Sequence, residues 1–478
     1  MTKEAPSDLH GAIKAFRPSG NGYLIRGLVA AFIVAAVLLL PQVSDTTQDL
    51  WIGLAAIYAI IGLSINIITG HAGQISLGHQ AFVGIGAFMA AFIVKNVGGF
   101  QTDPLTGLVL APDQIPTGDF FIGVVVAGVT GTLMALLLGL VALRIRGLYL
   151  ALITLAFGLM AETTIFNWRA FTGGGAGGAA PRPASFVSNQ AYAYVALLIL
   201  AVFLIVDWRL TKSRAGRAIV AIRNEERVAA TLGVNVTRYK LLAFATAGFL
   251  AGVAGSLFAH WNQVVTAPDF VLQTAVVWIL MSVVGGLGSR AGVVIGSSFF
   301  AVFPLALSAA VGGASIRIPL LGEVLVQALS PWIGALLLVL TITLYPGGIG
   351  QQLRPIRRFL AGGPLVDSRH EAIQLGGFPA LIAFALTLLL TNGAMAPRLL
   401  FGLVAAIGVA VLSVLLLLEY LRQLARSAAR QAARRQATAV VATAPLPTAI
   451  VQETATQTTD DGPAETPAPA PSPKGGPA

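Results

Sequence analysis

The stretch that decides the fold runs from Trp51 to Val97 and reads WIGLAAIYAIIGLSINIITGHAGQISLGHQAFVGIGAFMAAFIVKNV. Its outer parts, 51–69 and 81–97, are apolar runs close to the length of about 20 residues that crosses a bilayer as a helix. The segment Gly70–Phe88, which joins them and extends into the second run, carries two histidines, two glutamines, one serine and five glycines. Long apolar runs broken by a polar, glycine-rich segment predict an all-α membrane protein with interrupted helices.

Composition supports the same class of protein. Of the 478 residues, 56% are hydrophobic and only 10% are charged, whereas a soluble protein carries about 25% charged residues. The net charge of +10 sits between apolar runs and does not gather on one face with aromatic residues, so nucleic acid is not expected as a partner. Without cysteine there is no disulfide, thiol nucleophile or cysteine-based metal site.

Further apolar runs of similar length follow along the chain, and they predict a polytopic helical permease with about 10–12 spans. The short run at 377–391 and the glycine-rich segment around Gly285 could each be a half-helix. The candidate spans are 27–43, 51–69, 81–97, 120–142, 148–166, 191–208, 240–260, 272–288, 292–312, 330–346, 377–391 and 397–418.

The basic residues predict the orientation of these spans. With the amino terminus in the cytoplasm, only five of the 30 Lys and Arg residues fall outside, namely Lys95, Arg169, Arg182, Arg317 and Arg398. The remaining 25 fall in cytoplasmic connections or termini, as the positive-inside rule requires. We therefore expect both termini to be cytoplasmic.

Eight of the basic residues lie between Arg209 and Lys240, in a polar connection between two spans. Asn224 suits a helix N-cap, Glu225 and Glu226 place negative charge in the first turn, and Gly233 suits the left-handed residue that ends a helix. The apolar face of this helix would consist of Val228, Ala229 and Leu232. A helix of about eight residues is too short to persist alone in water, so we expect it to dock against a partner. The alternative is a basic loop that only fixes the topology.

The polar segment from Gly70 to Gln80 cannot face lipid, because backbone groups inside a membrane must be paired or line a protein cavity. We expect it to line or support a translocation route. Gly73 and Gly78 would allow close backbone approach, and Gln74, Ser76 and His79 would present polar groups. A plain cytoplasmic turn is the alternative. No metal site is expected, because His71 and His79 have no third ligand nearby in the sequence.

Glu162 lies near the outer end of a span, on a face similar to that of Thr154. Carboxylates within membranes are candidates for function, although exposure to water at the outer end would explain this one equally well. The glycine-rich loop Thr172–Pro183 lacks the lysine and the preceding strand of a phosphate-binding loop. The chain has no Walker motif, nucleophile elbow or zinc-protease motif, so we expect a transport subunit with no catalytic residue and no cofactor.

Four segments, taken in order, resemble one known family. They are GHAGQISLGHQAFVGIGAF, RIRGLYLALITLAFG (Arg144–Gly158), GRAIVAIRNEERVAATLGVNVTRYKLLAFATAGFLAGVAGSLFA (Gly216–Ala259) and MSVVGGLGSRAGVVIGS (Met281–Ser297). This pattern is similar to the inner-membrane permease subunits of branched-chain amino-acid ABC importers, in particular the LivM type, and to the related urea permeases. The resemblance extends from about residue 50 to LYPGGIG at Leu344–Gly350.

The resemblance implies four kinds of partner: a second, LivH-type permease subunit, two cytoplasmic ATPase subunits, a periplasmic solute-binding protein and an amino-acid substrate, all in a bacterial inner membrane. It places the ATPase-coupling segment at Ala221–Gly233, with Glu226, Ala229 and Gly233 at matching positions. The candidate coupling residues are Ala221, Arg223, Glu225, Glu226, Ala229 and Gly233. The candidate translocation residues are Gly70, Gly73, Gln74, Ser76, Gly78, His79, Thr154 and Glu162.

The predicted organisation has a cytoplasmic segment (1–26), a permease core (27–350) containing the coupling loop (209–240), and a cytoplasmic linker (351–376). An additional transmembrane hairpin (377–420) and a basic, then Ala- and Pro-rich, disordered cytoplasmic tail (421–478) follow, and both depart from the family pattern. Two other functions stay open: an ABC permease for urea or short amides, and a secondary transporter or channel acting alone. The second is disfavoured because the spans show no series of carboxylates for ion coupling.

Overall fold

The computed structural model describes residues 39, 41–42, 44–97, 101–102, 109–110, 115–142, 148–174, 177–311, 315–318 and 322–325. All of them belong to one compact unit of the chain. The predicted segments 1–26, 351–376 and 421–478 lie outside the described residues, as do the predicted spans 330–346, 377–391 and 397–418 and most of 27–43.

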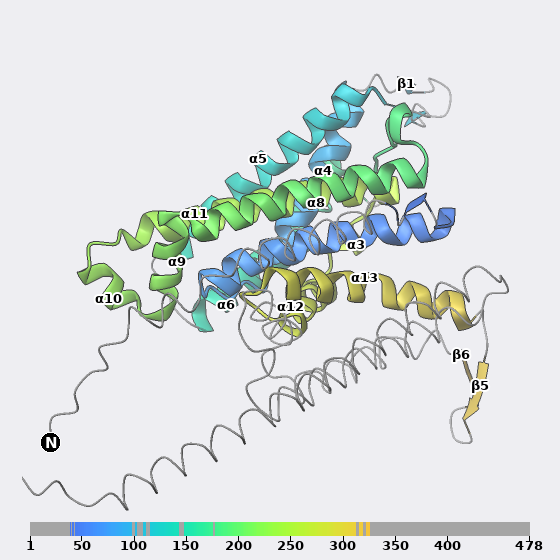
Figure 1. The fold of residues 1–478 in the computed structure, drawn as a ribbon. Helices are drawn as coiled ribbons and strands as arrows, with labels where there is room; N and C mark the ends of the chain where they lie inside the picture. Colours follow the sequence, from blue (N-terminus) through green and yellow to red (C-terminus); the bar gives the residue numbers. More distant parts are fainter. Residues whose placement is uncertain are drawn as a thin grey trace, which may run out of the picture. The chain divides into compact units, whose positions relative to one another are not determined.

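Helices make up most of the described residues (Figure 1). The long ones are α3 (Thr46–Ile65), α4 (His79–Val97), α5 (Thr117–Ala142), α8 (Asn189–Lys212), α11 (Val236–Asn262) and α13 (Arg290–Val311). The shorter α-helices are α6 (Leu148–Met160), α7 (Arg169–Thr172), α9 (Arg214–Asn224), α10 (Glu226–Thr231) and α12 (Leu272–Gly285). Two π-helical segments, η1 (Asn66–His71) and η2 (Ala161–Ile165), continue α3 and α6, and two 3₁₀ turns are η4 (Ala184–Phe186) and η5 (Ala267–Phe270).

The strands are short and pair only two at a time. They are β1 (Gln101–Thr102) with β2 (Val109–Leu110), β3 (Gly178–Ala179) with β4 (Val264–Val265), and β5 (Ser315–Ile318) with β6 (Gly322–Leu325), all antiparallel. These pairs join connections between helices and form no sheet core within the described residues. The described fold is therefore all-α, as predicted.

Each predicted span that falls on described residues is helical. Four of the described helices, Thr46–His71, Thr117–Val141, Asn189–Lys212 and Val236–Asn262, are long and apolar enough to cross a membrane. Helix α12 is one of three shorter apolar helices in the described part of the chain, and its 14 residues rise only about 21 Å at 1.5 Å per residue. That length suits the half-helix expected near Gly285.

Helix α11 lies at the centre of the packing and contacts α5, α4 and α3 (Figure 1). Small residues make this possible: a Cβ atom at Gly252 would lie 2.2 Å from the backbone oxygen of Ala127, and one at Gly255 would lie 1.9 Å from that of Val83. Inside a bilayer the hydrophobic effect does not draw helices together, so close van der Waals contact of this kind drives their association.

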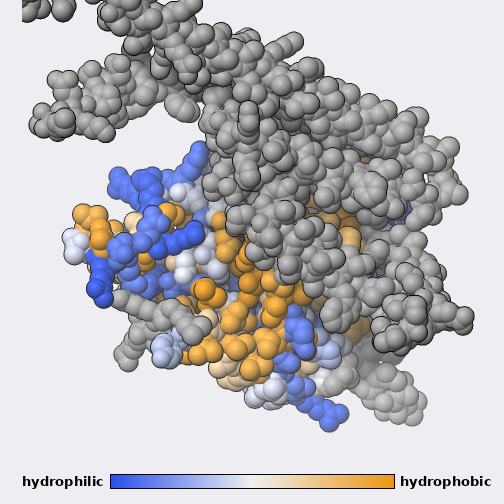
Figure 2. Space-filling view, turned by 90° about the horizontal axis from the view of Figure 1, so that it is seen from below, coloured by the Kyte–Doolittle hydropathy of each residue, from blue (hydrophilic) through white to orange (hydrophobic). Residues whose placement is uncertain are grey.

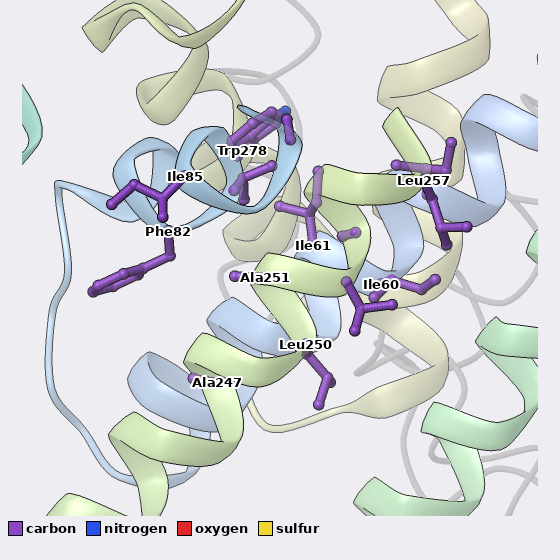
Figure 3. Packing of buried hydrophobic residues seen from close by; sticks show 14 of the residues in the cluster. Ile60, Ile61, Phe82, Ile85, Ala247, Leu250, Ala251, Leu257 and Trp278 are labelled. Carbon is purple, nitrogen blue, oxygen red and sulfur yellow. The ribbon is translucent and has the colours of Figure 1, made fainter. Parts of the chain in front are cut away.

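Large apolar side chains fill the space between these helices. Figure 3 shows Ile60 and Ile61 of α3, Phe82 and Ile85 of α4, Leu250 and Leu257 of α11, and Trp278 of α12 in one cluster. All of these side chains are almost fully buried within the chain. The core thus joins four helices, α3, α4, α11 and α12, from distant parts of the sequence.

Helix α5 presents a row of large apolar side chains to its surroundings. Val125, Val129, Leu133 and Leu137 recur every fourth residue and are between 47% and 57% exposed. On the side seen from below, Figure 2 also shows hydrophobic residues over the middle of the visible described surface and hydrophilic residues at its edges. Because proteins in water rarely expose rows such as that of α5, the exposed face of α5 suits lipid or another membrane protein.

Candidate functional site

The candidate coupling segment forms two consecutive helices between α8 and α11. Ser213 separates α8 from α9, and its side chain accepts a hydrogen bond from Gly216 N at the start of α9. Glu225 has an extended backbone between α9 and α10. The prediction that Asn224 caps the second helix was wrong, because α9 continues through Asn224 and Glu225 occupies the cap position. Helix α10 has six residues, fewer than predicted.

The end of α10 follows the prediction. Gly233 has φ of +80°, in the left-handed region that glycine enters without strain. Gly233 N donates to Ala230 O at 3.0 Å, and Val234 N donates to Ala229 O at 3.0 Å. This pair of bonds is a Schellman motif, which satisfies carbonyl groups that the end of a helix leaves unpaired.

The predicted apolar face of α10 divides into two parts. Ala229 is buried at 2% exposure, and α10 contacts both α9 and α11. Val228 and Leu232, by contrast, are 53% and 78% exposed. The short helix is therefore held by its own chain on one side and presents two large apolar side chains on the other.

Glu226 is held by an ion pair with the neighbouring helix. Its Oε2 lies 2.9 Å from Lys240 Nζ, and the Lys240 side chain is only 4% exposed. Position 226 is also the first residue of α10, where the helix dipole stabilises a carboxylate. Glu226 therefore ties the start of α10 to α11, a contact that the sequence pattern did not predict. Of the other coupling candidates, Ala221, Arg223 and Glu225 are exposed.

The predicted polar break is real: α3 continues as the π-helical turn η1, and a non-helical segment follows up to α4. Its backbone groups find partners within the protein. Gln74 N donates to Ile68 O at 2.9 Å, and Leu77 N donates to Thr154 Oγ1 of α6 at 2.9 Å. Gly73 and Gln74 are accessible, whereas Ser76, Gly78 and His79 are buried. The break is thus enclosed largely by the chain itself.

Gly78 packs directly against α6. A Cβ atom at this position would lie 1.9 Å from Thr154 O and 3.1 Å from Gly158 N. Gly73 also has a close neighbour, because a Cβ atom there would lie 2.8 Å from Arg223 Cγ. The close approach expected at both glycines is present, against α6 in one case and against the coupling segment in the other.

His79 belongs to a buried hydrogen-bonded chain. Its Nε2 lies 2.9 Å from Ser64 Oγ, and Ser64 Oγ donates to Ala247 O at 2.6 Å. Since the hydroxyl has a single proton and gives it to the carbonyl, His79 Nε2 is the donor to Ser64. His79 thus links α4 to α3 and, through Ser64, to α11.

Three further side chains of the break have buried polar atoms without a hydrogen-bond partner in the described structure. They are His71, through its Nδ1, Ser76, through its Oγ, and Gln80, through both amide atoms. Buried polar atoms are normally paired, so these groups are exceptions within an otherwise hydrogen-bonded break. Gln80 lies beside α6, because a Cβ atom at Gly158 would be 2.5 Å from its Nε2.

Thr154 and Glu162 do not share one site. Thr154 accepts the hydrogen bond from Leu77 N and belongs to the break. The Oε2 of Glu162 accepts a hydrogen bond from Leu272 N at 3.0 Å, at the start of α12. A carboxylate stabilises the positive end of a helix, so Glu162 supports α12 about 12 Å along the helix from Thr154.

Sequence reasoning named Gly70 and Arg223 but not the contact between them, and it missed Asn66, Asp207, Gly288 and Arg290. Arg223 Nη1 donates to Gly70 O, and Gly288 N donates to Asn66 Oδ1 at 2.7 Å. Asp207 is completely buried in α8 and pairs with Arg290 at the start of α13. The signal was present in the sequence, because Asp207 interrupts an apolar span and carboxylates in such spans are candidates for function.

The described residues include no group of three or more His, Cys, Asp or Glu side chains placed to hold a metal ion. What the geometry brings together is a broken, buried connection between membrane helices and a short capped helix with an exposed apolar tip. Together with the long apolar helices, these features define a polytopic α-helical membrane protein with a transport-type architecture.

The chain belongs to the family described as the permease component of the branched-chain amino acid transport system, whose model matches residues 49–345. It is 32% identical over 302 residues to the high-affinity branched-chain amino acid transport system permease protein LivM of Salmonella typhimurium, and 32% identical over 304 residues to that of Escherichia coli. Each match covers 57% of this chain and 66% of the relative, so the chain spans just under two thirds of these relatives' length.

A more distant relative is the probable branched-chain amino acid transport permease protein LivM of Methanocaldococcus jannaschii. It is 25% identical over 272 residues, which is 52% of this chain and 76% of the relative. No solved structure shows a significant match to the chain.

Proposed function

We propose that this chain is the membrane-spanning permease subunit of an ATP-driven importer of branched-chain amino acids in a bacterial inner membrane. In this proposal a second, LivH-type permease completes the pathway, two ATPase subunits bind on the cytoplasmic side, and a periplasmic binding protein delivers the substrate. The substrate class comes from the names of the LivM relatives.

The observation that carries the proposal is helix α10. A loop needs charge to set topology, but it does not need a Schellman motif, an ion pair to a buried lysine and two exposed apolar side chains. Leu232 at 78% exposure and Val228 at 53% form a small apolar tip on a firmly held helix. An amphipathic helix of this kind fits into a groove of a soluble partner, and the ATPase subunit is the partner that the proposal requires.

The test is reconstitution of the chain with its partner permease, ATPases and binding protein in lipid vesicles. We expect radiolabelled leucine to accumulate only when both ATP and the binding protein are present. Urea supplied at the same concentration should neither accumulate nor compete. Leucine uptake by this chain alone, driven by an ion gradient, would contradict the proposal. Selective uptake of urea would show that the substrate is urea and not a branched-chain amino acid.

The proposed orientation also has support in the contacts. The break, the coupling segment and the start of α13 meet at one end of the helices through Arg223, Gly70, Asp207 and Arg290. At the other end, β3 pairs with β4, and buried Arg182 donates to His260 O. The connections predicted to be cytoplasmic and those predicted to be external are thus gathered at opposite ends of α11.

This orientation predicts a labelling pattern. Thr237→Cys and Asn262→Cys lie at exposed positions near the two ends of α11, which are about 38 Å apart at 1.5 Å per residue. In intact cells a membrane-impermeant thiol reagent should label Asn262→Cys and spare Thr237→Cys until the cells are opened. The natural chain has no cysteine and serves as the blank. The reverse pattern would invert the proposed topology.

A further inference from the structure

A cluster of polar side chains lies where the break, the coupling segment and the α12–α13 connection meet. Through side-chain or backbone atoms it contains Asn66, Gly70, His71, Asp207, Thr211, Arg223, Gly288 and Arg290. We refer to it as the polar cluster. Of these residues, only Gly70 and Arg223 were among the candidate site residues drawn from the sequence.

Asp207 and Arg290 form the centre of the polar cluster. The Asp207 side chain is fully buried, and its Oδ2 accepts a hydrogen bond from Arg290 Nε. Arg290 Nη2 also donates to Thr211 Oγ1, one helical turn further along α8. Two bonds from one guanidinium therefore fasten the first residue of α13 to the last turns of α8.

Arg290 occupies a position that is unfavourable for a cation. It is the first residue of α13, and a cation at a helix N-terminus is disfavoured by the helix dipole. Its side chain is also only 29% exposed. The carboxylate of Asp207 offsets both the unfavourable interaction with the helix dipole and the cost of burying the guanidinium. The pair is therefore a specific connection between two helices.

Asp207 also lies near His71, slightly too far away for a hydrogen bond. Its Oδ1 lies 3.7 Å from His71 Nδ1 at the end of η1, and both atoms are buried without a hydrogen-bond partner. A hydrogen bond between N and O requires about 3.2 Å or less. A shift of about half an ångström would close this contact, which would satisfy two unpaired groups.

The polar cluster is joined to the coupling segment on both sides of α9. Only Ser213 separates the end of α8, which carries Asp207 and Thr211, from the start of α9. Near the end of α9, Arg223 donates to Gly70 O, where the break begins. Any displacement of α9 therefore acts on the break directly through Arg223 and indirectly through Asp207.

We propose that Asp207 and Arg290 are positioning residues which transmit movement of α9 and α10 to the break at Gly70–Gly78. In this scheme the ion pair makes α8 and α13 move together, and the movement closes the contact between Asp207 and His71. This inference rests on the proposed function, because the movement is driven by the ATPase subunits that bind α10.

The test uses the full complex in vesicles with its binding protein, and it measures both ATP hydrolysis and leucine uptake. Asp207→Asn and Arg290→Gln should leave ATP hydrolysis close to that of the natural complex. We expect the uptake per ATP hydrolysed to fall by about fivefold or more, the range of typical coupling energies. Arg290→Lys retains the charge and should restore part of the leucine uptake per ATP hydrolysed. Lys95→Gln, an exposed position outside the polar cluster, is the matched control and should behave as the natural chain.

Three results would overturn the inference. The first is an unchanged ratio in both variants, and the second is a parallel loss of uptake and hydrolysis in assembled complexes. The third is failure of every variant to assemble, including Arg290→Lys, which would show that the polar cluster serves folding alone. Failure of the proposed function itself has a different signature, because the natural complex would then show no ATP-dependent uptake.

Discussion

Replacing Gly78 by leucine is expected to abolish leucine uptake while the ATPase subunits remain bound. Even a Cβ atom at this position would lie 1.9 Å from Thr154 O and 2.9 Å from Thr154 C. These are backbone atoms of α6, so the overlap is relieved only if α6 or the break moves as a whole. Displacement of about 1 Å at a working site reduces rates by roughly 100-fold, and we expect a loss of at least that order.

Two comparisons make this result specific. Gly118→Leu places the same side chain at an exposed glycine near the start of α5, where nothing lies within 4 Å of the added Cβ, and it should leave uptake unchanged. His79→Gln should reduce uptake less than Gly78→Leu, because an amide can still donate to Ser64 Oγ. Uptake in vesicles is the measurement, and co-purification of the ATPases is followed in parallel. Full uptake by Gly78→Leu would show that the break is an ordinary turn with no role in transport.

Replacing Gly233 by valine is expected to release the ATPase subunits. Nothing lies within 4 Å of a Cβ atom built at Gly233, so the substitution causes no overlap. Its effect comes from the backbone alone, because φ is +80° and a β-branched residue in the left-handed region is strained by about 1–3 kcal/mol. The chain can relieve that strain by unwinding the end of α10, which would displace Leu232 and weaken ATPase binding by roughly tenfold for each 1.4 kcal/mol.

The control for this prediction is Gly233→Asn. Asparagine enters the left-handed region more easily than other side chains and also ends helices, so this variant should bind the ATPases nearly as well as the natural chain. Binding can be measured by co-purification and by titration of the ATPases onto the permease in detergent. Equal binding by the valine and asparagine variants would show that the end of α10 does not matter for docking.

The charge at the start of α10 gives a related expectation. Glu226→Arg would place two cations together, since Lys240 is buried beside position 226. Leaving a buried charge unpaired is strongly destabilising, so α10 should detach from α11 and ATPase association should fall. Insertion into the membrane should stay normal, which a quantitative immunoblot of the membrane fraction would show. Unchanged ATPase association would contradict the role assigned to this ion pair.

Much of the architecture followed from local features of the sequence. Apolar runs of membrane length became helices, because a backbone in lipid must satisfy its own hydrogen bonds. The glycine-rich segment after Thr69 became a break, and Gly233 ended a short helix. These outcomes depend on a few neighbouring residues, and such residues can be read from the chain without knowing what packs against them.

The partners of the site residues could not be read in this way. Glu162 was a candidate as a carboxylate in a span, on a face similar to that of Thr154, yet Thr154 binds Leu77 and Glu162 binds Leu272. Asn224 looked like a cap, but packing extended α9 through it and left Glu225 as the cap. Local preferences of about 1 kcal/mol give way when tertiary contacts favour another arrangement.

By itself, the sequence determined the membrane class, the helical spans on described residues, the break and the short helix that Gly233 ends, because hydrophobic length, glycine and charge act over short distances. Only the tertiary structure decided that Arg223 binds Gly70 O, that Asp207 pairs with Arg290, and that His71 stops 3.7 Å short of Asp207. These contacts join residues far apart in the chain. Their formation depends on how α3, which continues into η1, packs against α8 and α13, because that packing brings the ends of these helices together.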